Sequence, residues 1–189
     1  MITKFDTTTQ NILTELEKTQ RQFWNIARVS AEFMYILIKE ENIKNAIEIG
    51  TSNGYSGIWL GKALKETGGH LTTIEYWDKR LSVAKENFKQ CGLEDVIIPR
   101  QGDACEILNS MPGDVKIDFA FIDANKREYI KYFEILDPHI RVGGYIACDN
   151  VLSHEEKCRP YIEAIDANPN YENVVLALPA GLSLARKLK

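Results

Sequence analysis

The sequence predicts an α/β fold in which a doubly wound, mostly parallel seven-stranded sheet follows two N-terminal helices. Short runs rich in β-branched and aromatic residues alternate with stretches of helical periodicity from residue 46 onward. A glycine-rich turn directly follows the first of these runs, which indicates a strand, a sharp turn and a helix. The last two runs flank a Pro-Ala-Gly segment, and this predicts an antiparallel hairpin at one edge of the sheet.

The spacing of apolar residues assigns each element in order. Helices are expected at residues 11–23 and 30–40, where apolar side chains recur every three or four positions. Strands are then expected at residues 46–49, 71–75, 96–99, 117–122 and 145–148, with the closing hairpin at 174–178 and 182–186. We expect one domain over residues 1–189, composed of a helical cap at 1–44 and a Rossmann-like core at 45–189.

Composition narrows the class of protein. The chain is 44% hydrophobic and 26% charged, with a net charge of −4, which is ordinary for a globular domain and does not favour a nucleic-acid-binding surface. The four cysteines form no CxxC pair, so we expect reduced thiols and a cytoplasmic setting. We expect no signal peptide and no membrane span, because the first residues are polar and the longest apolar run, residues 33–38, is short.

Polar side chains follow two of the predicted strands. Asp123 comes directly after the strand at 117–122, and Asp149 and Asn150 come directly after the strand at 145–148. These are the oxygen ligands that Mg²⁺ or Ca²⁺ takes, and Lys126 lies about one helical turn beyond Asp123. The pattern predicts a metal-assisted site for proton removal. The alternative is that the acidic residues only cap the following helices and that Lys126 is a surface lysine.

The glycine-rich turn at residues 48–56 favours a nucleoside cofactor that carries no phosphate. Gly50 and Gly54 allow a close backbone turn, but their spacing is not the GxGxxG of dinucleotide folds, and the lysine of a P-loop is missing. Glu75 closes the second strand, where an acidic side chain typically accepts hydrogen bonds from ribose hydroxyls. S-adenosylmethionine is therefore the natural candidate.

Together these motifs resemble the cation-dependent O-methyltransferases, the class I S-adenosylmethionine family that includes catechol and caffeoyl-CoA O-methyltransferases. The resemblance covers nearly the whole chain. It rests on the segments at 48–56, 73–75, 101–104, 121–126, 142–144, 149–150 and 181–186. The pairing of Phe-Ile-Asp-Ala-Asn-Lys at 121–126 with Asp-Asn at 149–150 is what indicates the metal-dependent branch.

The resemblance implies a role for each matching position. It implies that Asp123, Asp149 and Asn150 bind a divalent cation (Mg²⁺, or Mn²⁺ or Ca²⁺), and that Lys126 is the catalytic base, with Asp123 beside it. The residues implied to contact S-adenosylmethionine are Ile26, Glu48, Gly50, Thr51, Ser52, Ser56, Glu75, Tyr76, Asp103, Ala104, Asp123 and Asn125. Within this set Glu48 would line the methionine part, Glu75 would hold the ribose, and Asp103 would border the adenine.

The chain also departs from the family pattern. Trp77 stands where the family usually has Asp or Asn before a helix, so we expect Asp78 to cap that helix instead. Asn125 stands where many members have Asp. The segment between Asn150 and the strand expected at 174 is short, which leaves the cover of the acceptor pocket open. Of the three tryptophans, Trp24 and Trp77 are interpreted like Trp59, as core or interface aromatics.

The expected function is methyl transfer to a hydroxyl of a small catechol-like or phenolic acceptor. Two alternatives stay open at this point. One is methylation of a hydroxylated uridine in tRNA, which uses the same chemistry but fits the acidic net charge less well. The other is a non-catalytic S-adenosylmethionine-binding module, because a fold does not fix a function. The resemblance also implies a homodimer.

Overall fold

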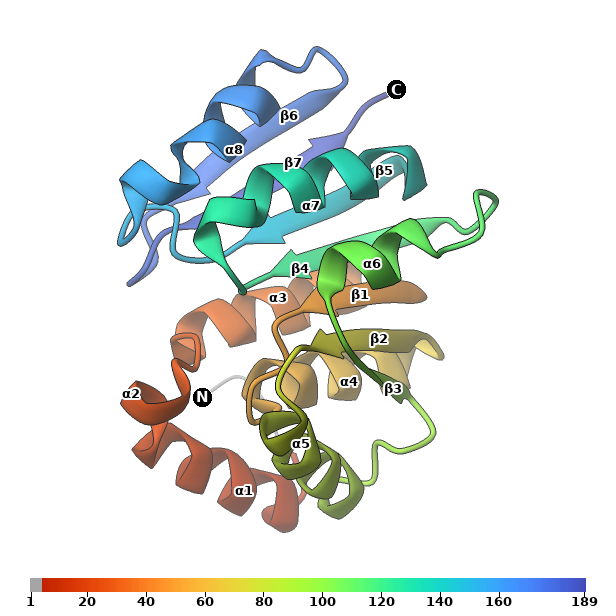
Figure 1. Ribbon diagram of the computed structural model, residues 1–189. Helices are drawn as coiled ribbons and strands as arrows, with labels where there is room; N and C mark the ends of the chain where they lie inside the picture. Colours follow the sequence, from red (N-terminus) through yellow and green to blue (C-terminus); the bar gives the residue numbers. More distant parts are fainter. Residues whose placement is uncertain (1–4) are drawn as a thin grey trace.

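In the computed structural model, which describes residues 5–189, helices cover both faces of one seven-stranded sheet (Figure 1). The strands lie in the order β3-β2-β1-β4-β5-β7-β6. The first five strands pair in parallel, whereas β7 is antiparallel to both β5 and β6. The strands are β1 (Asn45–Ile49), β2 (His70–Glu75), β3 (Ile97–Gln101), β4 (Ile117–Ile122), β5 (Ile140–Cys148), β6 (Tyr171–Leu176) and β7 (Leu182–Lys187). The predicted fold class and the C-terminal hairpin are confirmed.

The N-terminal helices differ from the prediction in their bounds. Helix α1 (Thr7–Lys18) begins before residue 11, because the Asp6 side chain caps it by accepting a hydrogen bond from the Thr9 amide at 2.8 Å. The predicted helix then breaks at Thr19, and a short α2 (Gln20–Phe23) follows and ends at Trp24 in the left-handed region, with φ 57°. Helix α3 (Arg28–Glu40) begins slightly before its predicted start.

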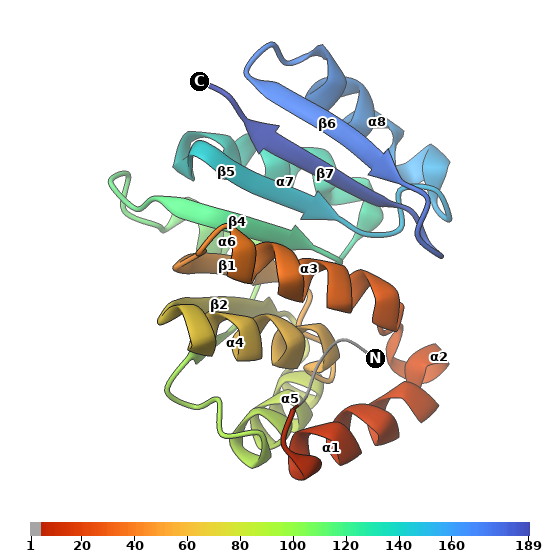
Figure 2. The same cartoon turned by 180° about the vertical axis from the view of Figure 1, so that it is seen from behind.

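Two groups of helices sandwich the sheet. Helices α3, α4 (Tyr55–Thr67) and α5 (Asp78–Gln90) lie on one side, and α6 (Ala104–Asn109), α7 (Tyr129–Leu136) and α8 (Glu155–Ala167) lie on the other (Figures 1 and 2). Strand β4 supplies both cores, because its side chains alternate between the two faces. Phe119 and Phe121 pack with α3 and α4, whereas Ala120 and Ile122 pack with α7.

Two further elements, β5 and α5, differ from the prediction at their starts. Strand β5 begins at Ile140 rather than at residue 145. After β2, the helix α5 starts at Asp78 with Trp77 at its N-cap position and no side-chain cap, so the predicted capping by Asp78 is wrong. The Trp77 amide instead donates to the Glu75 carboxylate at 2.9 Å. Among the described residues, no helix has the length and apolar character needed to cross a bilayer.

Candidate functional site

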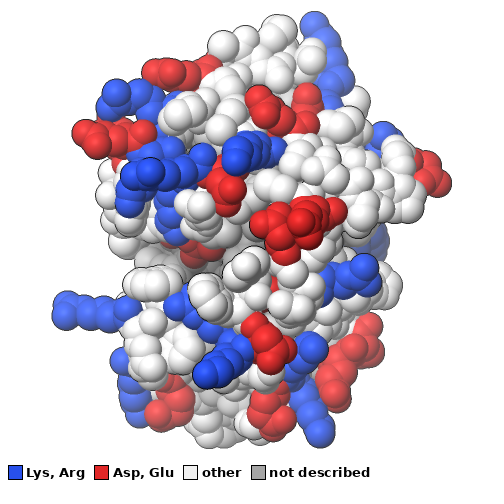
Figure 3. Space-filling model, viewed as in Figure 1, with Lys and Arg blue, Asp and Glu red and all other residues white. Residues whose placement is uncertain are grey.

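A cavity of about 750 Å³ opens beyond the carboxyl ends of β1, β2 and β4. The chain crosses from one side of β1 to the other at this point, and such a switch in strand order leaves a crevice where α/β proteins bind ligands. Figure 3 shows the hollow on the left of the molecule, below the N-terminal ends of α7 and α8 and above the N-terminal segment. The volume falls in the range of small-molecule sites.

The turn between β1 and α4 forms one wall of the cavity. Gly50 has φ +104°, and a Cβ atom there would lie 2.1 Å from the backbone oxygen of Asp123, so only glycine fits. The Ser52 hydroxyl donates to the backbone oxygen of Phe23 at 2.8 Å, which fastens the segment after α2 over the turn. The glycine-rich turn therefore contacts both the segment after β4 and the segment after α2, and these three segments meet at the cavity.

Glu75 is held in a fixed orientation at the end of β2. It is buried, and its two carboxylate oxygens accept hydrogen bonds from the backbone amides of Ser52, at 2.8 Å, and Trp77, at 2.9 Å. Each carboxylate oxygen can accept more than one hydrogen bond, so Glu75 keeps acceptor capacity toward the cavity that it lines. This geometry suits a ligand that presents hydroxyl groups.

Glu48 and Asp103 do not line the cavity. Glu48 is fully buried behind Ser56, whose hydroxyl donates to it at 2.5 Å, and Thr73 donates to its other oxygen at 2.6 Å. Burial raises the pKa of Glu48 to about 7 against the effect of these two hydrogen bonds, and the nearby acidic charges add to the increase. Asp103 caps α6 by accepting from the Glu106 amide, while its neighbour Ala104 lines the cavity.

Asp123 and Asp149 bring two carboxylates together at the ends of β4 and β5. Asp149 is only 2% exposed, and its Oδ1 atom has no hydrogen-bond partner among the residues that the structure describes. Burial and then the charge of Asp123 raise the pKa of Asp149 to about 7, although the Asn150 amide and Lys126 act in the opposite direction. A buried carboxylate oxygen without a donor is costly, and either a proton or a cation bound there would offset that cost.

Lys126 and Asn150 complete this group at the cavity wall. The Lys126 Nζ atom lies 2.8 Å from Asp123 Oδ1, as the spacing of three residues predicts. Asn150 adopts φ 67° and lines the cavity beside Asp123. Within residues 5–189 no three His, Cys, Asp or Glu side chains gather as a metal-binding group. The arrangement instead offers two carboxylates and one amide, all of them oxygen donors that suit a hard divalent cation.

Most of the predicted site residues meet at this one cavity. Asp149, Glu48 and Asp103 are absent from its lining. The predicted residues that line it are Ile26, Gly50, Thr51, Ser52, Ser56, Glu75, Tyr76, Ala104, Asp123, Asn125, Lys126 and Asn150.

The sequence did not indicate the aromatic mouth of the cavity. Trp59 is fully buried as expected, but Trp24 is 69% exposed and Trp77 is 60% exposed, and both line the cavity rather than the core. The Arg80 guanidinium stacks over the Trp24 ring at 4.6 Å, which links α5 to the segment after α2. The left-handed backbone at Trp24 places the ring there, and no residue pattern signals that turn.

Comparison with known proteins gives a consistent result. A family model described as O-methyltransferase matches residues 4–188. The chain is 31% identical to caffeoyl-CoA O-methyltransferase 2 of Populus trichocarpa, over 92% of this chain and 80% of the relative. It is 37% identical to catechol O-methyltransferase of Niastella koreensis, over 64% of this chain and 55% of the relative. An O-methyltransferase from Bacillus cereus in complex with SAH superposes with a TM-score of 0.86 at 28% identity, covering 99% of this chain and 93% of that one.

Proposed function

Because the chain belongs to the O-methyltransferase family, we propose that it transfers a methyl group from S-adenosylmethionine to a hydroxyl of a small catechol-like or phenolic acceptor, with a divalent cation. The main support for the cation dependence, and for the acceptor class that follows from it, is the side chain of Asp149. Its buried Oδ1 atom has no hydrogen-bond partner among the described residues. Asp149 also lies close to the charge of Asp123 and directly precedes Asn150 in the chain. A vicinal diol is the acceptor chemistry that such a site suits.

The cavity fits S-adenosylmethionine. Its sulfonium supplies an already activated methyl group, so the protein mainly has to align donor and acceptor. Glu75 would accept hydrogen bonds from the ribose hydroxyls, the turn at Gly50 and Ser52 would surround the methionine part, and Tyr76 and Ala104 would flank the adenine. The glycine turn without a phosphate cradle supports this cofactor, as does the SAH complex of the Bacillus cereus relative, since SAH is the demethylated form of S-adenosylmethionine.

The donor set fits a divalent cation. Asp123, Asp149 and Asn150 would hold it through oxygen atoms, which favours Mg²⁺, with Mn²⁺ and Ca²⁺ as substitutes. When bound, such an ion lowers the pKa of a coordinated hydroxyl and fixes its oxygen. The charge of the ion would also offset the burial of Asp149 and the neighbouring charge of Asp123, which together raise the pKa of Asp149.

Lys126 is the proposed base. In its neutral form, which the charge of a bound cation would favour, its Nζ atom would accept the proton of the acceptor hydroxyl, and Asp123, 2.8 Å away, would hold the resulting ammonium group in place. The ring of Tyr129, with its centroid 5.9 Å from Nζ, covers the lysine from the side of α7. Lys126 is thus positioned by contacts on two sides, at the wall where the two carboxylates meet.

We extend the proposal to the organisation of the protein. Residues 1–189 act as one domain, in which the helical cap at 1–44 covers the core at 45–189. All four cysteines are free, which supports a cytoplasmic setting. Exposed apolar side chains at Val29 and Ile36 of α3 support a homodimer through the N-terminal helices.

A methyl-transfer assay tests the proposal. Catechol, a hydroxycinnamoyl thioester, and tRNA with and without hydroxyuridine are supplied with labelled S-adenosylmethionine, in Mg²⁺ or in EDTA. We expect transfer to the catechol-like acceptors, loss of transfer in EDTA and recovery with Mg²⁺. Full turnover in chelator would contradict the cation dependence, and exclusive transfer to the modified tRNA would contradict the acceptor class.

A further inference from the structure

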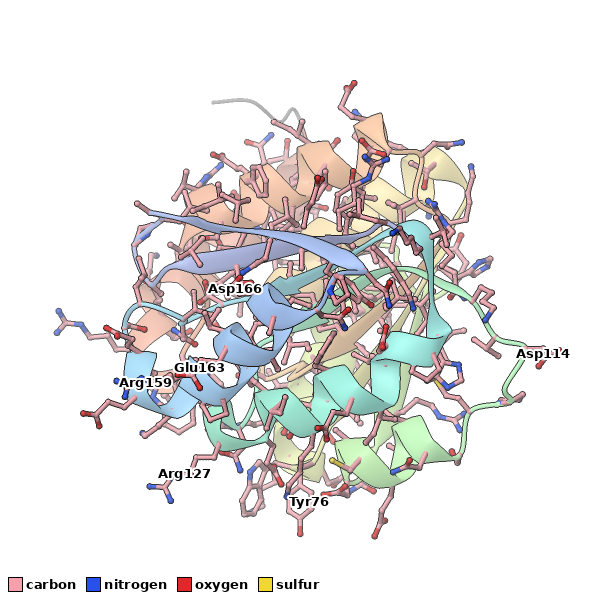
Figure 4. All side chains as sticks on the ribbon, turned by 90° about the horizontal axis from the view of Figure 1, so that it is seen from above. Tyr76, Asp114, Arg127, Arg159, Glu163 and Asp166 are labelled. Carbon is pink, nitrogen blue, oxygen red and sulfur yellow. The ribbon has the colours of Figure 1, made fainter. Side chains whose placement is uncertain are left out.

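The wall of the cavity formed by the starts of α7 and α8 carries positive charge. Arg127 lines the cavity from the 3-10 helix η1 (Lys126–Glu128), directly before α7, and Lys157 lines it from the first turn of α8. Both side chains are exposed. Figure 3 shows Lys and Arg side chains grouped above the hollow, and Figure 4 shows Arg127 extending into solvent from the turn before α7. The chain as a whole carries a net charge of −4, so this positive wall differs from the average surface.

The other charged groups that line the cavity already have partners. Lys126 is paired with Asp123 at 2.8 Å. Glu128 lies 3.5 Å from Lys131 and accepts hydrogen bonds from the Tyr132 hydroxyl and the Asn125 amide. These two ion pairs offset the charges of Lys126 and Glu128 on the α7 side of the cavity.

The opposite wall carries one charge of each sign, the carboxylate of Glu75 and the guanidinium of Arg80. Both carboxylate oxygens of Glu75 accept hydrogen bonds from backbone amides, and Arg80 stacks on Trp24. Glu155, in the first turn of α8, does not line the cavity and faces Arg159 at 4.0 Å. Among the residues that the structure describes, Arg80, Arg127 and Lys157 line the cavity without an ion pair. Arg80 shares its wall with the carboxylate of Glu75, whereas Arg127 and Lys157 lie on neighbouring elements of the other wall.

The charge of Lys157 acts on His154, which lines the same cavity. His154 sits one helical turn beyond Asn150, and its amide donates to the Asn150 backbone oxygen at 2.9 Å. Burial lowers the pKa of His154, and the charges of Lys126 and Lys157 lower it further. A ligand that enters past this wall therefore meets excess positive potential on one side only.

We propose that the methyl acceptor carries an anionic group, a carboxylate or a phosphate, on the side remote from its reacting hydroxyl, and that Arg127 and Lys157 bind this group. The inference rests on the proposed function, because it places the hydroxyl at Lys126. The guanidinium of Arg127 binds a carboxylate or phosphate through two parallel hydrogen bonds, and the ammonium of Lys157 adds a second charge. These residues act in specificity and are not catalytic residues.

A matched pair of acceptors tests the inference. Protocatechuate is catechol with a carboxylate on the ring, and its methyl ester has nearly the same shape without the charge. We expect the wild-type kcat/KM to be about 10-fold higher for the acid than for the ester, through KM, and the preference to shrink at high salt. A catechol phosphonate assayed in parallel distinguishes a carboxylate site from a phosphate site.

Four variants assign the preference to residues. Arg127→Gln and Lys157→Gln should each lower the acid-to-ester ratio by roughly 3- to 5-fold, as expected for exposed charge pairs, and Arg127→Glu should invert it. Arg159→Gln is the matched control, because Arg159 is an exposed arginine on α8 that does not line the cavity (Figure 4). It should leave the ratio unchanged.

The outcomes separate this inference from the proposed function. Equal turnover of acid and ester, or an unchanged ratio in the Arg127 and Lys157 variants, would overturn the anion site and leave the enzyme activity standing. If no small acceptor is methylated, calorimetric binding of protocatechuate in the presence of SAH and Mg²⁺ decides: binding that weakens in Arg127→Gln would support the anion site while the proposed function fails. Transfer to hydroxyuridine-containing tRNA alone would overturn the small anionic acceptor.

Discussion

Replacement of Asp149 by asparagine should make the protein more stable at high pH and weaken its response to divalent cations. The carboxyl is buried, its Oδ1 atom has no partner among the described residues, and its pKa rises from 3.8 to about 7. Because the folded state holds this proton more tightly than the unfolded chain, the stability from it is fully present below about pH 3.8 and is lost as the pH rises through 7.

The size of the effect follows from this pKa difference. At pH 8 the ionised carboxylate costs about 4 kcal/mol of unfolding free energy, at ~1.36 kcal/mol for each pKa unit between 3.8 and about 7. Asparagine has the same shape without the charge, so Asp149→Asn should regain an amount of this order. For a chain of this length the gain corresponds to a rise in Tm of roughly 10 °C. At pH 4 the two proteins should differ by less than about 1 kcal/mol.

Urea unfolding at pH 4, 6 and 8, in EDTA and in Mg²⁺, measures both effects. Mg²⁺ should stabilise the wild type, more strongly at pH 8 than at pH 6, because the ion binds the deprotonated carboxylate. Asp149→Asn should show neither the pH-dependent cost nor the full Mg²⁺ response. Asp114→Asn, in the exposed loop before β4 (Figure 4), is the control and should behave as the wild type. A difference between wild type and Asp149→Asn that is the same at pH 4 and pH 8 would refute the reasoning.

Three further outcomes test the cavity itself. Lys126→Ala should lower kcat by ~10²–10⁴ with unchanged cofactor affinity, and arginine should not rescue it, because a guanidinium cannot accept the proton; near wild-type kcat at neutral pH would show that the lysine is not the base. Glu75→Ala should weaken S-adenosylmethionine binding by ~1.5–3 kcal/mol in calorimetry, since the ribose loses its charged acceptor, and an unchanged affinity would contradict that role. Gly50→Ala should destabilise the fold by at least ~1–3 kcal/mol of backbone strain, plus the clash of its Cβ atom with the Asp123 backbone oxygen, as thermal unfolding would measure.

The fold and the edge that carries the site could be predicted because both depend on local patterns. Alternating β-rich and helical stretches predict parallel strands, and parallel strands end at the same edge of a sheet. Residues that follow a strand, such as Asp123 after β4, were therefore expected to meet residues of the glycine turn. The backbone hydrogen bond from the Asp123 amide to the Ile49 oxygen, at 2.9 Å, shows how direct that meeting is.

Features that depend on contacts between distant segments could not be predicted in this way. The break at Thr19 and the left-handed Trp24 place an exposed indole at the cavity, where Arg80 of α5 stacks on it. Trp24 and Arg80 belong to no sequence motif, and they lie far apart in the sequence. The predicted capping of α5 failed because the helix begins one residue earlier. The Trp77 backbone oxygen accepts from the amides of Arg80 and Leu81, both at 3.0 Å, so Asp78 lies inside the first turn.

The burial of three acidic residues shows how far a residue's position at a strand end predicts whether it lines the cavity. Glu48 precedes the last residue of β1 and lies behind the cavity, whereas Glu75 is the last residue of β2 and lines it. For these two residues, position relative to the strand end decides whether the side chain lines the cavity, and this position can be predicted from the sequence. Asp149 breaks the rule, since it follows the end of β5 and is nevertheless 2% exposed. Tyr129 of α7 donates its hydroxyl to the Asp149 backbone oxygen at 3.1 Å, so a helix packed over the strand end, rather than the strand itself, buries this carboxyl and raises its pKa.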